Sequence, residues 1–187
     1  MAEVTIFNSP VHSDCIITYP YGVIDYSYKC DFHTGLDFAP YGTTGRNPDL
    51  YPVVNGEVVE VATTGSLGYR VVIKDSNNHY WRYCHMVADS IAVTLGQQVT
   101  INDKIGNMGA TGNVTGIHLH LECSTTLAWN CSTFLNPATV LDIPNIDNTI
   151  IHFGGTPPPP PPPTPTSTEN YKKWGWFMNN RKVRINL

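Results

Sequence analysis

The sequence predicts an all-β domain with very little helix. Between residues 51 and 121, short runs rich in Val, Ile and Tyr alternate with glycine-containing turns, which is typical of antiparallel strands. The same region lacks the 3.6-residue apolar spacing of an amphipathic helix. A chain of 187 residues can bury one principal core. We therefore expect an antiparallel β-sheet core with an open groove and few short helices.

The strands are expected in four runs that turn residues separate, namely 53–65, 69–86, 90–99 and 101–112. Asn55-Gly56 predicts a tight turn, because both residue types tolerate positive φ. A second turn is expected at residues 75–78, between two strands. One short helix is expected over residues 137–141, where Asn136 can cap the first turn and proline suits the first helical position.

Proline divides the chain into three parts. Eight of the 15 prolines lie between Pro157 and Pro165. Proline fixes φ and lacks an N–H donor, so residues 156–168 are expected to form an extended polyproline II linker after a domain of residues 1–155. Residues 169–187 crowd aromatic side chains among basic ones. This segment is either a disordered tail or a small anchor for an anionic polymer, complete or as a remnant.

Charge is unevenly distributed along the chain. Residues 1–168 carry 6 Lys and Arg against 14 Asp and Glu, whereas residues 169–187 carry 5 against 1. The acidic domain is not expected to bind nucleic acid. No run of 18 apolar residues is present, and the first residues lack the basic and apolar regions of a signal peptide. We therefore expect no membrane insertion, and synthesis in a cytoplasm without a signal for Sec export.

Five cysteines make an odd count without CxxC spacing, so a small disulfide scaffold is not expected. Two pairs could close short loops, Cys15 with Cys30 and Cys123 with Cys131, but the spacing does not decide the pairing. Several buried free thiols are the alternative.

Two histidine clusters carry the chemistry of this sequence. The first is HTGLD, from His33 to Asp37, and the second is HLHLE, from His118 to Glu122. In an extended strand, residues i and i+2 point to one face, so His118, His120 and Glu122 share a polar face opposite a core face. His33 and Asp37 also share a side if the chain is extended there, and the glycine between them leaves room for a close neighbour.

Three ligands of the histidine nitrogen and carboxylate oxygen type suit a catalytic zinc ion, which binds three protein side chains and leaves one position for water. A third motif, Tyr83-Cys84-His85, adds another histidine; regular alternation predicts that Tyr83 and His85 share a face and that Cys84 points away. A competing site that joins Cys30 to His33 lacks a second pair of ligands. Glu122 is expected to support a histidine through a hydrogen bond, with a direct role as general base as the alternative.

The order HxxxD, YxH and HxH, together with FHTGLDFAPYGT, VVNGEVVEV and GATGNVTGIHLHLE, resembles the lysostaphin-type (LytM-like) zinc endopeptidases of bacterial cell walls. The resemblance covers about residues 17–141. It implies that one Zn²⁺ ion is held by His33, Asp37 and His120. It also implies that His85 and His118 are the catalytic histidines, which handle the water and the developing oxyanion.

The resemblance further implies a peptidoglycan hydrolase with an open substrate groove, which cleaves a peptide bond in the cross-bridge or stem peptide. Its partners would be peptidoglycan and, through residues 169–187, an anionic wall polymer, and the chain is expected to be a monomer. A catalytic domain followed by a linker is typical of a phage endolysin, made in the host cytoplasm and acting on the wall. A tail-associated lysin, an autolysin, and a non-catalytic wall-binding or hydrolase-activating protein are the alternatives.

Overall fold

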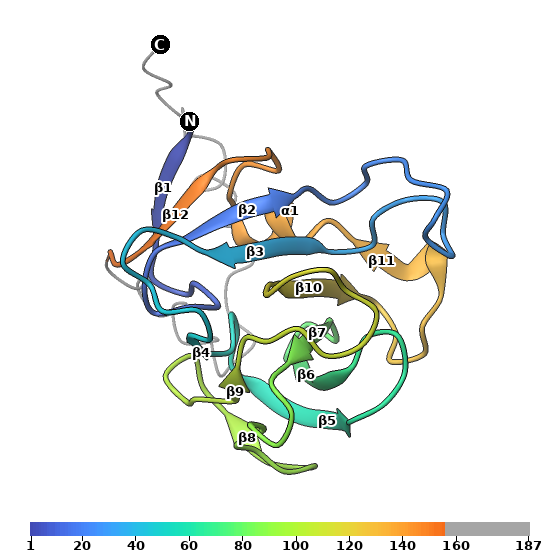
Figure 1. The fold of residues 1–187 in the computed structure, drawn as a ribbon. Helices are drawn as coiled ribbons and strands as arrows, with labels where there is room; N and C mark the ends of the chain where they lie inside the picture. The colour runs from blue at the N-terminus through green and yellow to red at the C-terminus, as the bar shows by residue number, and fades with distance from the viewer. Residues whose placement is uncertain (156–187) are drawn as a thin grey trace, which may run out of the picture. The chain divides into compact units, whose positions relative to one another are not determined.

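The computed structural model describes residues 1–155, which fold into β-strands with a single short α-helix (Figure 1). The all-β prediction is therefore confirmed. The predicted linker, residues 156–168, and the predicted C-terminal segment, residues 169–187, lie outside the described residues. The elements in this part of the chain are β1 Glu3–Ile6, β2 Cys15–Tyr19, β3 Leu36–Pro40, β4 Asp49–Leu50, β5 Gly56–Ala62, β6 Tyr69–Asp75, β7 Tyr80–Met86, β8 Gln98–Val99, β9 Gly106–Asn107, β10 Leu119–Ser124, the 3-10 turn η1 Cys131–Thr133, β11 Phe134–Leu135, α1 Pro137–Leu141 and β12 Ile150–Phe153.

One large sheet has the strand order β1-β12-β2-β3-β10-β7-β6-β5-β8, with β11 paired to β10, and β4 and β9 form a separate pair. Strands β1 and β12 run parallel, and the other strand pairs among residues 1–155 are antiparallel. In Figure 1, β3 and β10 lie side by side in the middle of the domain. No helix in this region is long and apolar enough to cross a membrane.

The core lies against one face of the three central strands β3, β10 and β7. In the ladders, Leu119 faces Phe38, and Leu121 lies between Leu36 and Tyr83. All five side chains are fully buried. Because side chains alternate along β10, this packing directs His120 and Glu122 to the opposite face, as the period-2 pattern predicted.

Two of the local predictions are confirmed. The turn after β6 leads into β7, and the Asp75 carboxylate accepts hydrogen bonds from the backbone N–H groups of Asn77 and His79. Helix α1 spans Pro137–Leu141, and the Asn136 side chain caps it by accepting from the N–H of Ala138.

The tight turn predicted at Asn55-Gly56 is wrong. Gly56 is the first residue of β5 and pairs with Asp75 on one side and Val99 on the other. A Cβ at Gly56 would lie 2.3 Å from the carbonyl oxygen of Lys74. Glycine is therefore needed here for close approach of two strands, and not for a turn.

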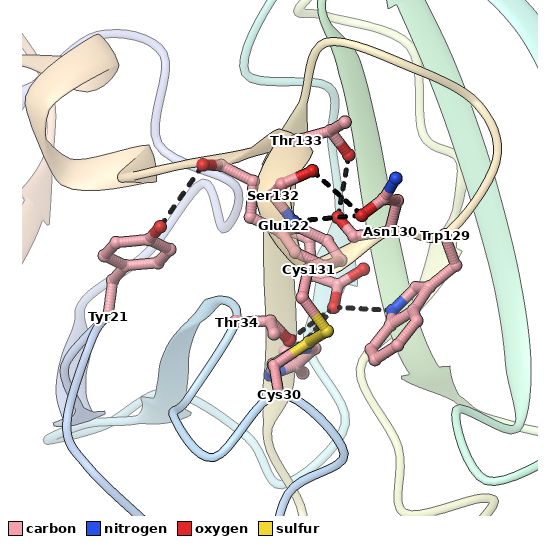
Figure 2. Close-up of a disulfide and its surroundings, with 11 residues drawn as sticks. Tyr21, Cys30, Thr34, Glu122, Trp129, Asn130, Cys131, Ser132 and Thr133 are labelled. Carbon is pink, nitrogen blue, oxygen red and sulfur yellow. Dashed lines mark hydrogen bonds and ion pairs between the residues drawn. A yellow bond between two sulfur atoms is a disulfide. The ribbon is translucent and has the colours of Figure 1, made fainter.

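The disulfide joins Cys30 to Cys131, across 101 residues of sequence (Figure 2). Neither of the short-loop pairs predicted from the sequence forms. Cys15 lies in β2 and Cys123 in β10, and both thiols are buried in the core. The disulfide instead ties the segment before β3 to η1, and it removes Cys30 from any metal site with His33.

Gly35 provides the space that the ring of His120 occupies. A Cβ at this position would lie 2.6 Å from Cε1 of His120 and 2.8 Å from the carbonyl oxygen of Leu121. Both neighbours belong to β10, which is held between β3 and β7 and cannot move away freely. The glycine of the HTGLD motif is thus explained by packing.

Gly35→Ala is expected to lower the free energy of unfolding by about 1–3 kcal/mol, because the added methyl group overpacks the contact between the loop and β10. Urea denaturation followed by circular dichroism measures this change. Gly45→Ala is the matched control, since a Cβ there meets nothing within 4 Å. Equal stability of the two variants would show that the ring of His120 is not held against Gly35.

Replacing both Cys30 and Cys131 by Ser is expected to lower the free energy of unfolding by about 2–5 kcal/mol, because the crosslink closes a long loop in the unfolded chain. Urea denaturation of the wild type with and without a phosphine reductant should show the same loss. The double variant should not respond to the reductant. A wild type whose unfolding midpoint is unchanged by reduction would contradict the prediction.

Candidate functional site

The three predicted metal ligands come together on the polar face of the central strands. Asp37 in β3 lies directly opposite His120 in β10, and directly opposed residues of an antiparallel pair share a face. His33 precedes β3 and folds back onto the same place. All three side chains are buried, with relative exposures of 0% for His33, 8% for Asp37 and 4% for His120.

The three atoms of these side chains that could bind a metal ion form a nearly equilateral triangle. Nε2 of His33 lies 3.1 Å from Oδ1 of Asp37 and 3.0 Å from Nδ1 of His120, and Nδ1 of His120 lies 2.8 Å from the same Oδ1. Tetrahedral zinc with bonds of about 2.0–2.1 Å places its ligand atoms about 3.3 Å apart. Two imidazole nitrogens and one carboxylate oxygen are also a ligand set that zinc favours in hydrolytic sites. The group therefore fits a zinc ion.

Hydrogen bonds behind each ring orient the correct nitrogen toward this triangle. Nδ1 of His33 lies 2.8 Å from the carbonyl oxygen of Pro20, which can only accept, so Nδ1 carries the proton and Nε2 offers its lone pair. Nε2 of His120 lies 3.2 Å from Oε1 of Glu122, which leaves Nδ1 as the ligand atom. Such partners behind the ligands are usual for metal-binding histidines.

The electrostatics of the cluster favour positive charge at its centre. Burial opposes the charged form of His120, but its hydrogen bonds to Asp37 and Glu122 and their charges outweigh burial and raise its pKa to about 10. Burial likewise opposes the ionised Asp37, but its close contacts with the rings of His120 and His33 hold the pKa of this carboxyl well below its usual range. A bound cation would replace the proton on His120, because imidazole binds metals in its neutral form.

The two predicted catalytic histidines lie beside this cluster. The rings of His85 and His118 are 4.9 Å apart between centroids, and Nε2 of His118 is 3.6 Å from Oδ2 of Asp37. Nδ1 of His85 donates to the carbonyl oxygen of Thr111 at 2.8 Å, and Nδ1 of His118 donates to that of Gly116 at 3.1 Å. Both rings therefore keep Nε2 available as a proton acceptor. Burial lowers the pKa of His85 to about 4, which keeps this ring neutral.

The prediction that Cys84 points away from this site is wrong. Cys84 lies directly opposite His120 in the β10–β7 ladder, so the two residues share a face. The pairing of β6 with β7 shifts register between Tyr69 and Val71, and His85 has φ of 61°. This bulge breaks the alternation on which the prediction relied. Burial, reinforced by the charge of Glu122, raises the pKa of the Cys84 thiol well above its ordinary value, which makes it a poor nucleophile.

Supporting residues of the site include three that the sequence reasoning missed. Glu122 binds the ring of His120 as predicted, and it also accepts from Thr34, Arg82 and Trp129. Arg82 offered a signal that could have been used, because an arginine inside the apolar strand YWRYCHM must find a buried carboxylate. No pattern in the sequence distinguishes Thr34 or Trp129.

The other histidines are not part of the cluster. His79 pairs with Asp75 at 3.3 Å, and His152 pairs with Asp14 at 2.9 Å. His12 stacks on the ring of Tyr51. Within residues 1–155, the only group of three or more His, Cys, Asp or Glu side chains that could hold a metal ion is His33, Asp37 and His120.

Comparison with known proteins gives relatives over about half of the chain. The chain is 41% identical over 91 residues to peptidoglycan DD-endopeptidase ShyA of Vibrio cholerae, covering 48% of this chain and 20% of that protein. It is 31% identical over 110 residues to Endolysin 2638A of Staphylococcus phage 2638A, covering 52% of this chain and 23% of that protein. The chain thus spans about a fifth of the length of these curated relatives.

Solved structures share the fold. The catalytic domain of the antimicrobial peptidase lysostaphin from Staphylococcus simulans matches with a TM-score of 0.57 and 24% identity, over 70% of this chain and 92% of that one. The catalytic domain of the prophage-encoded M23 protein EnpA from Enterococcus faecalis matches with a TM-score of 0.52 and 30% identity, over 66% of this chain and 88% of that one.

The model of peptidase family M23 matches residues 31–131, more than half of the chain. This span contains all the candidate residues, namely His33, Asp37, His85, His118 and His120. The chain therefore belongs to peptidase family M23.

Proposed function

We propose that residues 1–155 form a zinc-dependent endopeptidase that cleaves a peptide bond in bacterial peptidoglycan. The observation that carries this proposal is the triangle of His33, Asp37 and His120 beside two imidazoles, His85 and His118, whose Nδ1 atoms are held by backbone carbonyl groups. All five positions hold residues capable of their roles, which favours catalysis over a non-catalytic regulator. The bond lies in the cross-bridge or the stem peptide.

The names of the relatives support peptidoglycan as the substrate. ShyA is a peptidoglycan DD-endopeptidase, and 2638A is an endolysin. The endolysin relative also supports a phage setting, in which the chain is made in the host cytoplasm and reaches the wall during lysis. A place in the phage tail is the alternative setting.

A zinc ion held by His33, Asp37 and His120 would supply a Lewis acid that polarises the scissile carbonyl group and acidifies a water molecule. One of the two rings, His85 or His118, accepts on its Nε2 atom the proton of the attacking water. The other, once protonated, donates to the developing oxyanion or to the leaving amine. Because the backbone carbonyls of Thr111 and Gly116 hold the Nδ1 protons, neither ring has to change tautomer first.

Single substitutions should separate the ligands from the catalytic histidines. His120→Ala is expected to lose both zinc and wall-lytic activity, and so is Asp37→Ala. His118→Ala is expected to keep zinc and to lose about 10²–10⁴ in rate, the usual contribution of general acid–base catalysis. Metal analysis and the loss of turbidity of bacterial walls measure both properties, with His152→Ala as control. Lytic activity that survives in an Asp37→Ala, His120→Ala double variant would refute the ligand assignment.

Digestion of defined peptidoglycan is expected to create new free amino termini within the peptide and no reducing sugar ends, because the site has the groups for peptide hydrolysis. Amino-group labelling followed by mass spectrometry of the fragments identifies the bond. A chelator should abolish the reaction, and added zinc should restore it. Released reducing ends would indicate a glycosidase and would overturn the proposed function.

A further inference from the structure

The carboxylate of Glu122 is fully buried. Four hydrogen-bond donors surround it. Its Oε1 accepts from Oγ1 of Thr34 at 2.6 Å, from Nε2 of His120 at 3.2 Å and from Nε1 of Trp129 at 3.4 Å. Its Oε2 accepts from Arg82 at 2.6 Å. Figure 2 shows Glu122 with Thr34 on one side and Trp129 on the other.

This arrangement leaves the ring of His120 with one tautomer. An ionised carboxylate has lone pairs and no proton to donate, so the nitrogen that faces it must carry hydrogen. Nε2 of His120 is therefore the donor, and in the neutral ring that binds a metal Nδ1, which lies 3.0 Å from Nε2 of His33, keeps its lone pair for the triangle.

Stability alone does not account for the buried Glu122–Arg82 pair. Burying two charges costs several kcal/mol for each ion, and an apolar pair of similar volume is often as stable or more so. Here Arg82 is 3% exposed and its second nitrogen donates to the carbonyl oxygen of Leu127 at 3.0 Å, so its charge serves to hold the carboxylate in place. What the pair adds is an oriented acceptor directly behind His120.

The disulfide lies beside the same carboxylate. Thr34 follows Cys30 by four residues, and Trp129 precedes Cys131 by two, so the two segments that cover Glu122 are crosslinked to each other (Figure 2). Nζ of Lys29 lies over the ring of Trp129, 4.8 Å from its centroid. The crosslink therefore joins the two segments that carry these donors.

We propose that Glu122 is a positioning residue, which fixes His120 in the tautomer with the proton on Nε2 and thereby sets the affinity of the triangle for zinc. This inference rests on the proposed zinc site. The residues that carry it are Glu122, its charge partner Arg82, and the two donors, Thr34 and Trp129, that the disulfide brings together.

Two double variants test this role. Both carry Arg82→Met, and they differ only in the residue that replaces Glu122. Arg82→Met with Glu122→Leu removes both charges of the ion pair together, so neither is left buried without its partner, and the protein is expected to fold. With no acceptor behind His120, it should bind zinc about 10–100-fold more weakly than the wild type. Arg82→Met with Glu122→Gln retains an amide oxygen where Thr34, Trp129 and His120 donate, and it should bind zinc as the wild type does.

Zinc affinity is measured by competition with a chromophoric chelator, and the stability of each variant is measured with zinc removed. Equal affinities of the two double variants, whether both are like the wild type or both are weak, would overturn the role of the acceptor. A wild type that binds no zinc would instead refute the proposed function, which separates the two failures.

A measurement on the wild type keeps the proposal testable if the variants do not fold. Imidazole ¹⁵N NMR of the zinc-loaded protein is expected to show His120 protonated at Nε2, with a proton that exchanges slowly because Glu122 accepts it. A proton on Nδ1 of His120 would overturn the assignment.

Discussion

The register of β10 is the constraint on which the site depends. Leu119 and Leu121 are fully buried against β3 and β7, so the strand cannot slip by one residue without moving leucines out of the core and histidine into it. The same register sets His120 opposite Asp37 and sends Glu122 to the same face. The alignment of ligand atoms to within about 3 Å is thus a consequence of apolar packing on the other side of the sheet.

The polar face of β10 and β3 carries charged side chains, and burying any one of them alone would be unfavourable. Ionised Glu122 and Asp37 are buried close to each other, and each needs donors in order to remain charged. Arg82 supplies a donor to Glu122, whereas Asp37 lies against the metal-ligating nitrogens of the histidine rings, where a bound cation would balance its charge. Removing one member leaves its partner charged and unpaired, so the network is kept or lost as a unit.

The sequence predicts those features that depend on local periodicity. Alternation gives the two faces of β10, and Asn136 before proline gives the start of α1. Pairings across long sequence distances are not encoded locally, so spacing favours the wrong partners for Cys30. Gly56 illustrates a third limit, because close approach of strands and a tight turn both select glycine, and only the tertiary structure distinguishes them.

His85 shows why the orientation of a catalytic side chain can escape a period-2 rule. Its φ of 61° lies in the left-handed region, which costs a residue other than glycine about 1–2 kcal/mol. The bulge that imposes this conformation allows Cys84 to face His120 while the next residue, His85, also approaches the site, 5.9 Å from the ring of His120 between centroids. A regular strand would send one of the two to the opposite face. The strain is therefore the local cost of placing a second imidazole beside the triangle, and packing of the surrounding sheet maintains it.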